Sequence, residues 1–112
     1  MEVTISDRQL KKVVNDDRKF TKKYGPRRAK LIKQRLDDLT DIETLEEARY
    51  LPGRYHELTG DRKGQWACDL DNPHRLIFVP RADPIPTDPD GKYIWVEILA
   101  VEITEIVDYH GK

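Results

Sequence analysis

Residues 65–79 of this 112-residue chain read QWACDLDNPHRLIFV. Every second residue from Trp66 to Leu70 is apolar, which is the period of a strand with one buried face. The turn signal Asp-Asn-Pro follows at 71–73, and a second strand then places Leu76 and Phe78 on a common face. This stretch therefore predicts an antiparallel hairpin with its apolar residues on one side.

The residues before the hairpin predict one strand and two helices. Residues 2–6 alternate like a short strand, and a capping-box pattern that begins at Ser6 starts a helix near Asp7. Gly25 and Pro26 end that helix, since glycine supplies a C-cap and proline suits the first turn of a second helix. The apolar positions of the second helix follow the 3.6-residue period: Ala29, Ile32, Leu36 and Leu39. We expect the two helices to form an antiparallel hairpin.

Further segments extend the sheet. Residues 45–50 predict one or two more helical turns, and residues 55–58 predict a short strand. Residues 60–64 form a turn bounded by glycines, and residues 101–107 predict a last strand. The strands follow each other through short turns, so most neighbours in the sheet are expected to be antiparallel.

The stretch before the last strand is less regular. Residues 80–92 are rich in proline and predict an irregular loop, whereas residues 93–99 are rich in β-forming residues, and their pattern leaves open whether they pair. We expect residues 1–112 to form a single α+β domain of order β-α-α-β-β-β, with room for one further strand. In this domain an N-terminal helical hairpin packs on a mostly antiparallel, twisted sheet.

Charge is unevenly distributed along the chain. The formal net charge is −1, yet residues 1–36 carry twelve Lys and Arg against four acids, a local charge of +8. Residues 83–112 sum to −5. A block of +8 is a candidate surface for a polyanion, and the solvated faces of two amphipathic helices are the competing interpretation.

Several classes of protein are disfavoured. Cys68 is the single cysteine, so an internal disulfide is impossible, and its place in the register of Trp66 favours a buried, inert thiol. The three histidines and the cysteine have no metal-ligand spacing, so we expect neither a metal nor a cofactor. No apolar run is long enough to span a membrane and no secretory signal is recognisable, so the protein is expected to be cytoplasmic.

Polar residues at strand ends and turns are the candidates for chemistry. Imidazoles suit proton transfer near neutral pH, and guanidinium and ammonium groups suit phosphate charge. Together they are what phosphodiester cleavage by an internal 2′-hydroxyl requires, although each residue alone is more often structural. The candidates are His56, Arg62, Lys63, Arg75, Asp108, Tyr109 and His110.

Four of these segments, in this order, resemble a known family. They are residues 51–58 (Leu-Pro-Gly-Arg-Tyr-His-Glu-Leu), residues 60–66 (Gly-Asp-Arg-Lys-Gly-Gln-Trp), residues 74–78 (His-Arg-Leu-Ile-Phe) and residues 108–110 (Asp-Tyr-His). The pattern is similar to that of HigB-type host-inhibition ("killer") toxins of the RelE/ParE superfamily. The resemblance implies a RelE-like fold, with an insertion at about residues 80–100.

The same resemblance implies a function. These toxins belong to type II toxin–antitoxin systems, and they are metal-independent endoribonucleases (mRNA interferases) that cleave translated mRNA in the ribosomal A site. Their partners are the ribosome, mRNA and a helix-turn-helix, HigA-like antitoxin. Two alternatives stay open: a toxin of the same superfamily that binds a protein such as DNA gyrase, and an inactive antitoxin-binding module.

Roles for individual residues also follow from the resemblance. His56, Asp108, Tyr109 and His110 match catalytic positions, and Arg75 matches a cation near the scissile phosphate. Arg62 and Lys63 match RNA-contacting charges. The basic helical block, Arg27 and Arg28 included, would then face ribosomal RNA.

Overall fold

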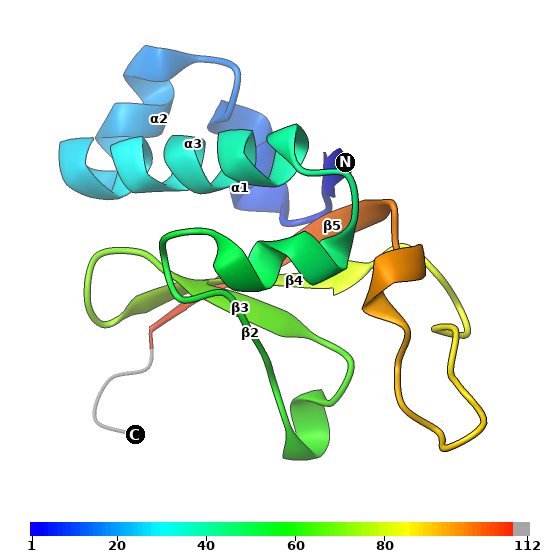
Figure 1. Cartoon of the computed structure of the whole chain (residues 1–112). Helices are drawn as coiled ribbons and strands as arrows, with labels where there is room; N and C mark the ends of the chain where they lie inside the picture. The colour runs from blue at the N-terminus through cyan, green and yellow to red at the C-terminus, as the bar shows by residue number, and fades with distance from the viewer. Residues whose placement is uncertain (109–112) are drawn as a thin grey trace.

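The structure, a computed structural model, describes residues 1–108, so Tyr109 and His110 lie outside the described residues. In chain order a first strand is followed by a run of helical segments, and most of the sheet comes from the second half of the chain (Figure 1). They are β1 (Glu2–Ile5), α1 (Arg8–Val13), α2 (Asp17–Tyr24), α3 (Pro26–Asp41), the 3₁₀ helix η1 (Leu45–Tyr50), β2 (His56–Glu57), η2 (Gly60–Arg62), β3 (Trp66–Asp69), β4 (His74–Pro80), η3 (Trp95–Glu97) and β5 (Ala100–Asp108).

The strands form one five-stranded sheet in the order β1-β5-β4-β3-β2. β1 runs parallel to β5, and the other neighbouring pairs are antiparallel. α1, α2, α3 and η1 all lie over one face of this sheet (Figure 1). We call this the helical face and the opposite one the outer face. The predicted α+β architecture, with helices packed on a mostly antiparallel sheet, is confirmed.

The core lies between the helices and the sheet, as the two periodicities predict. Trp66 and Cys68 on β3 and Leu76 and Phe78 on β4 are fully buried. From α3, buried side chains meet them at three of the four predicted positions: Ala29, Ile32 and Leu39. Leu36 is only partly buried, because the buried residue in that turn is Arg35.

The single helix predicted from Asp7 to Gly25 is wrong in one respect, because it is divided into α1 and α2. The Asp16 carboxylate accepts a hydrogen bond from Lys19 N (3.1 Å) and caps a new helix. The predicted cap at Ser6 is also displaced by one residue. Asp7 accepts from Leu10 N (3.0 Å), while the Ser6 hydroxyl donates to the Ile103 carbonyl of β5. The predicted junction at Gly25 holds.

Residues 93–99 do not form a strand. They contain η3, and Tyr93 makes only an isolated bridge with Thr87 across the irregular loop. Trp95 instead turns into the core and meets Trp66 edge to face, with ring centroids 5.5 Å apart. Burial of a large aromatic side chain outweighs the weak preference of neighbouring residues for a strand.

The buried Arg35 joins three elements. Its Nε donates to the Asp69 carbonyl of β3 (2.8 Å), and Tyr55 donates its hydroxyl to the Arg35 carbonyl (3.2 Å). The guanidinium lies directly against Gly53, where a Cβ would come within 2.6 Å of Arg35 Nε. Gly53 also has φ +113° and accepts a hydrogen bond from Asp69 N (2.7 Å). The chain that enters β2 is thereby fixed to both α3 and β3.

Gly53→Ala is therefore expected to lower the free energy of unfolding by about 2–4 kcal/mol, because the new methyl group meets both a positive φ and the guanidinium. Gly91→Ala is the matched control, since Gly91 has φ +81° but open space around its Cβ position, and about 1 kcal/mol is expected there. Urea denaturation of both variants measures the difference. Equal losses would show that the contact with Arg35 contributes nothing.

Candidate active site

The register of the sheet gathers polar residues on the outer face. His56 pairs with Ala67, and Ala67 with Ile77, which in turn lies opposite Glu105. Successive residues of a strand point to opposite faces, so this row faces away from the core, and so does the neighbouring row that contains Arg75. Both rows belong to the part of the sheet that the helices leave uncovered.

The His56 imidazole is oriented by a backbone contact. Its Nδ1 lies 2.8 Å from the Arg54 carbonyl oxygen. A carbonyl can only accept a hydrogen bond, so Nδ1 carries the proton in this contact. In the neutral ring, Nε2 is then the nitrogen with the free lone pair, which is the form that a general base needs.

Arg75 and Arg54 share one carboxylate. Arg75 Nε lies 3.0 Å from Asp69 Oδ1, and Arg54 Nε lies 3.2 Å from Asp69 Oδ2. Asp69 thus holds two guanidiniums on the outer face next to the row of His56. Sequence reasoning identified Arg75 and missed Arg54 and Asp69. The alternation in β3 placed Asp69 on the polar face, but the pairing came only from the strand register.

Arg62 also reaches the outer face. From η2 its Nη1 donates to Glu105 Oε2 on β5 (3.1 Å) and to Gln65 Oε1 (2.9 Å). Glu105 lies opposite Ile77, so Arg62 reaches across β3 and β4 to the row of Ala67 and Ile77, whose side chains are fully buried although no helix covers this face. Glu105 is the second acid that sequence reasoning missed.

Lys63 points to a different place from its neighbour Arg62. Its Nζ lies 5.5 Å from the centroid of the Tyr93 ring, beside a pocket on the helical side of β2. Arg62 and Lys63, the adjacent cations of the predicted RNA-contacting turn, therefore lie on opposite sides of the sheet edge.

Asp108 is not brought together with His56 and Arg75. A β-bulge between Ile77 and Phe78 inserts one extra residue in β5, which reverses the alternation beyond it. Asp108 consequently pairs with His74 and shares the helical face, with Oδ2 4.0 Å from His74 Nε2.

Arg28 belongs to this second cluster. It binds the Asp71 carboxylate through two nitrogens, at 2.8 and 3.1 Å, and His74 Nδ1 lies 3.9 Å from the same group. Hydrogen bonding from the Arg28 guanidinium lowers the pKa of the Asp71 carboxyl. The cluster of Arg28, Asp71, His74 and Asp108 thus joins α3 to the end of β5.

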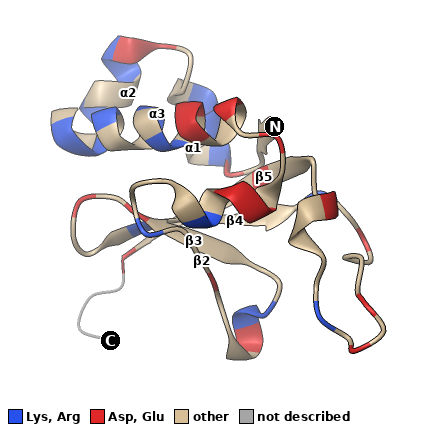
Figure 2. Cartoon of the chain, in the orientation of Figure 1, with Lys and Arg blue, Asp and Glu red and all other residues tan. Residues whose placement is uncertain are grey.

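The twelve Lys and Arg of residues 1–36 form two groups: three that bind other groups of the fold, and nine that are exposed. Arg28, Lys33 and Arg35 bind groups within the fold: Asp71, Asp17 and the Asp69 carbonyl. Nine others are exposed, and Figure 2 shows Lys and Arg spread over the helical layer. The nine are Arg8, Lys11, Lys12, Arg18, Lys19, Lys22, Lys23, Arg27 and Lys30. Arg27 is thus available to a partner in a way that Arg28 is not.

Among residues 1–108, no three His, Cys, Asp or Glu side chains are grouped so that they could hold a metal ion. Burial raises the pKa of the Cys68 thiol to about 12, so the thiol stays protonated at neutral pH, as expected for a buried, inert cysteine. In the same part of the chain, no helix has the length and apolar character to cross a membrane.

The chain was compared with known proteins. It matches no family model and no curated protein sequence. Among solved structures it is similar to the YoeB/ParE toxin from Agrobacterium tumefaciens, with a TM-score of 0.59 and 14% identity, over 98% of this chain and 100% of that one. This likeness confirms the predicted RelE-like fold. It does not distinguish the HigB type from other toxins with that fold.

The Arg28–Asp71 pair has a testable consequence. A depressed carboxyl pKa stabilises the fold above the usual Asp pKa of about 3.9, and this contribution is lost as the pH falls through the lower folded value. Asp71→Asn is expected to lower the free energy of unfolding by about 1 kcal/mol at pH 7, with the difference from wild type shrinking below about pH 4. Chemical denaturation across pH tests this. Asp37→Asn, which removes an exposed carboxylate of α3, is the control and should show no such dependence.

Proposed function

We propose that this protein is the toxin of a type II toxin–antitoxin pair and a metal-independent endoribonuclease that cleaves translated mRNA in the ribosomal A site. The observation that carries the proposal is the placement of His56 with three arginines on the outer face, in a chain with the fold of the YoeB/ParE toxin. An imidazole beside cations is the arrangement that phosphodiester cleavage by a 2′-hydroxyl requires.

The proposed chemistry starts at His56. Neighbouring strands are about 4.8 Å apart, and Arg75 lies two residues along β4 from Ile77, the residue in the row of His56. β2 and β4 therefore hold His56 and Arg75 roughly 12 Å apart across the sheet, enough for a nucleotide between them. His56 Nε2 removes the proton of the 2′-hydroxyl, whose oxygen attacks the adjacent phosphorus. Arg75 stabilises the charge that develops on the phosphate oxygens. The bond to the 5′ oxygen breaks, and a 2′,3′-cyclic phosphate remains.

The leaving 5′ oxygen needs a proton. On the resemblance of the terminal Asp-Tyr-His motif, we assign this proton to Tyr109 or His110. Asp108 contacts His74 on the helical face, so we assign it the positioning of these two residues. His74 and Asp71 are the groups through which that position is connected to Arg28.

Charge balance on the outer face supports ribosome dependence. Arg54 and Arg75 are each paired with Asp69, and Arg62 is paired with Glu105. A phosphate must compete with Asp69 and Glu105 for these guanidiniums, which makes binding of naked RNA weak. The exposed cations of the helical layer can supply the missing attraction by contacting ribosomal RNA. The same surface is also available to an acidic region of a helix-turn-helix, HigA-like antitoxin.

His56→Ala and Arg75→Ala are each expected to abolish toxicity and to reduce ribosome-dependent cleavage by about 100- to 10,000-fold. Arg75→Lys should restore only part of the activity, because lysine lacks the planar fork that binds two oxygens. Arg81→Ala is the control, since Arg81 is an exposed arginine near the end of β4 that pairs with Glu2. Growth assays and 5′-end mapping of transcripts, with thermal stability measured in parallel, provide the test. Undiminished toxicity of His56→Ala would favour a protein target such as DNA gyrase, and no toxicity in the wild type would favour an inactive antitoxin-binding module.

The nucleophile can be tested separately. An mRNA with a single 2′-deoxy sugar at the cut site should resist cleavage on the ribosome, and the normal products should end in 2′,3′-cyclic phosphate. An mRNA with the deoxy sugar one nucleotide away is the control and should be cut normally. Cleavage of the first substrate at an unchanged rate would refute attack by the 2′-hydroxyl.

A further inference from the structure

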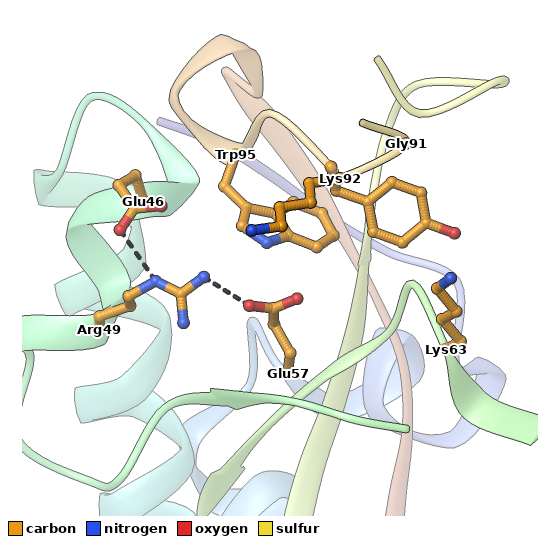
Figure 3. Close-up of a pocket in the computed structure, with 8 residues that line it drawn as sticks. Glu46, Arg49, Glu57, Lys63, Gly91, Lys92 and Trp95 are labelled. Atoms are coloured by element: carbon orange, nitrogen blue, oxygen red, sulfur yellow. Dashed lines mark hydrogen bonds and ion pairs between the residues drawn. The ribbon is translucent and has the colours of Figure 1, made fainter. Parts of the chain in front are cut away.

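A pocket of about 350 Å³ lies beside β2, the strand at the edge of the sheet (Figure 3). It is on the helical side of this edge, whereas His56 is on the outer side. Four segments line it: the consecutive η1, β2 and turn at residues 60–64, and the distant loop that leads into the start of η3. The last of these lies within the insertion predicted at residues 80–100. The volume is at the lower end of the range for ligand sites, which suits a single ring with its substituents.

One wall of the pocket is aromatic. Tyr93 and Trp95 contact each other with centroids 5.0 Å apart, and Trp95 is held in turn against Trp66. The Arg49 guanidinium lies over the Trp66 ring, 5.1 Å from its centroid. Trp66 therefore contacts two residues that line the pocket, Arg49 and Trp95. Trp95 is buried and fixes the position of Tyr93, whose partly exposed ring is the one on which a flat ring can stack.

The other groups of the pocket are charged. Arg49 is bound by the carboxylates of Glu46 (2.8 Å) and Glu57 (2.5 Å), as Figure 3 shows. Lys63 and Lys92 form no ion pair within residues 1–108, and both line the pocket beside its aromatic wall. The acids are thus used by Arg49, and the two lysines are left to attract an anion.

We propose that this pocket is a subsite for one nucleotide of the RNA strand, whose base stacks on Tyr93 beside the buried Trp95 and whose phosphate meets Lys63 and Lys92. The proposal rests on the proposed function for the identity of the strand. A ring and an anion together are the chemistry that the lining can recognise.

The edge of the sheet favours RNA over an acidic peptide as the occupant. His56 and Glu57 are adjacent residues of β2, and they face the outer face and the pocket respectively. Arg62 and Lys63 divide in the same way, one toward Glu105 and the other toward Tyr93. A single strand that leaves His56 around this edge stays beside a cation throughout and arrives at the aromatic wall. A peptide needs no such continuous path.

The two tryptophans of the chain make binding measurable, because Trp95 lines the pocket and Trp66 contacts Trp95. Titration of the wild-type protein with ribonucleoside 5′-monophosphates is expected to quench tryptophan fluorescence saturably. Tyr93→Leu should weaken binding by about 5- to 100-fold through loss of stacking. Lys63→Gln with Lys92→Gln should weaken binding and reduce its dependence on salt. Lys30→Gln, on the exposed side of α3, is the matched control and should change neither.

The outcomes separate this proposal from the proposed function. A monophosphate contains no phosphodiester bond to cleave, so its binding does not depend on catalysis, and His56→Ala should bind it normally. No saturable quenching at millimolar nucleotide would overturn the subsite, as would quenching that the lysine double variant leaves unchanged. Loss of antitoxin binding in this double variant, with nucleotide binding intact, would likewise overturn it and identify a protein partner. If Tyr93→Leu lowers thermal stability, the lysine variant decides.

Discussion

The buried guanidinium of Arg35 is the interaction on which the candidate site depends. A charge in the interior is tolerated only when it is hydrogen-bonded, and Arg35 finds its acceptor in the backbone of β3 at Asp69. The close approach to Gly53 then fixes the chain that leads into β2, which places Arg54 in a left-handed conformation with φ +54°. The Arg54 carbonyl in turn orients the His56 ring. The contact between Arg35 and Gly53 in the core thereby affects the orientation of His56 on the outer face.

Carboxylates organise the cations on that face. Asp69 and Glu105 hold arginines from three different segments on a sheet surface whose central row also contains the apolar Ala67 and Ile77. Ion pairs at this level of exposure contribute little to stability, but they restrict long side chains to one geometry. The face is in this way preorganised for an anion, although each of these arginines is already paired with a carboxylate. In the helical layer, by contrast, most cations are exposed and are not held by carboxylates of residues 1–108 in this way.

The edge strand β2 connects the two sites that we propose. It consists of only two residues, whose side chains point to opposite faces of the sheet. His56 therefore belongs to the candidate active site and Glu57 to the pocket. Arg49 links Glu57 to η1, so the helical side of this edge is as firmly held as the outer side. The segment that leads into η3 completes the pocket, because the burial of Trp95 holds Tyr93 at its rim. Part of the segment predicted to be an insertion thus lines the proposed site.

The sequence by itself determined the layers of the fold and several members of the site. The period of two in residues 66–78 and the 3.6-residue period of α3 predicted most of the side chains that these segments contribute to the core between helices and sheet, because burial of one face imposes these periods. It did not predict the division of α1 from α2, since the Asp16 cap is a local hydrogen bond that competes with helix continuation.

Tertiary structure decided which candidates meet. Residues 93–99 have the composition of a strand, but Trp95 packs against a residue 29 positions away in sequence, and this contact took precedence. Asp69 and Glu105 entered the site through pairings across the sheet that no local pattern contains. The β-bulge adds one residue to β5, and for this reason Asp108 lies on the helical face and not on the face of His56. Strand alternation is a local property, whereas register and bulges depend on the whole sheet, and for that reason only the folded chain could place these residues.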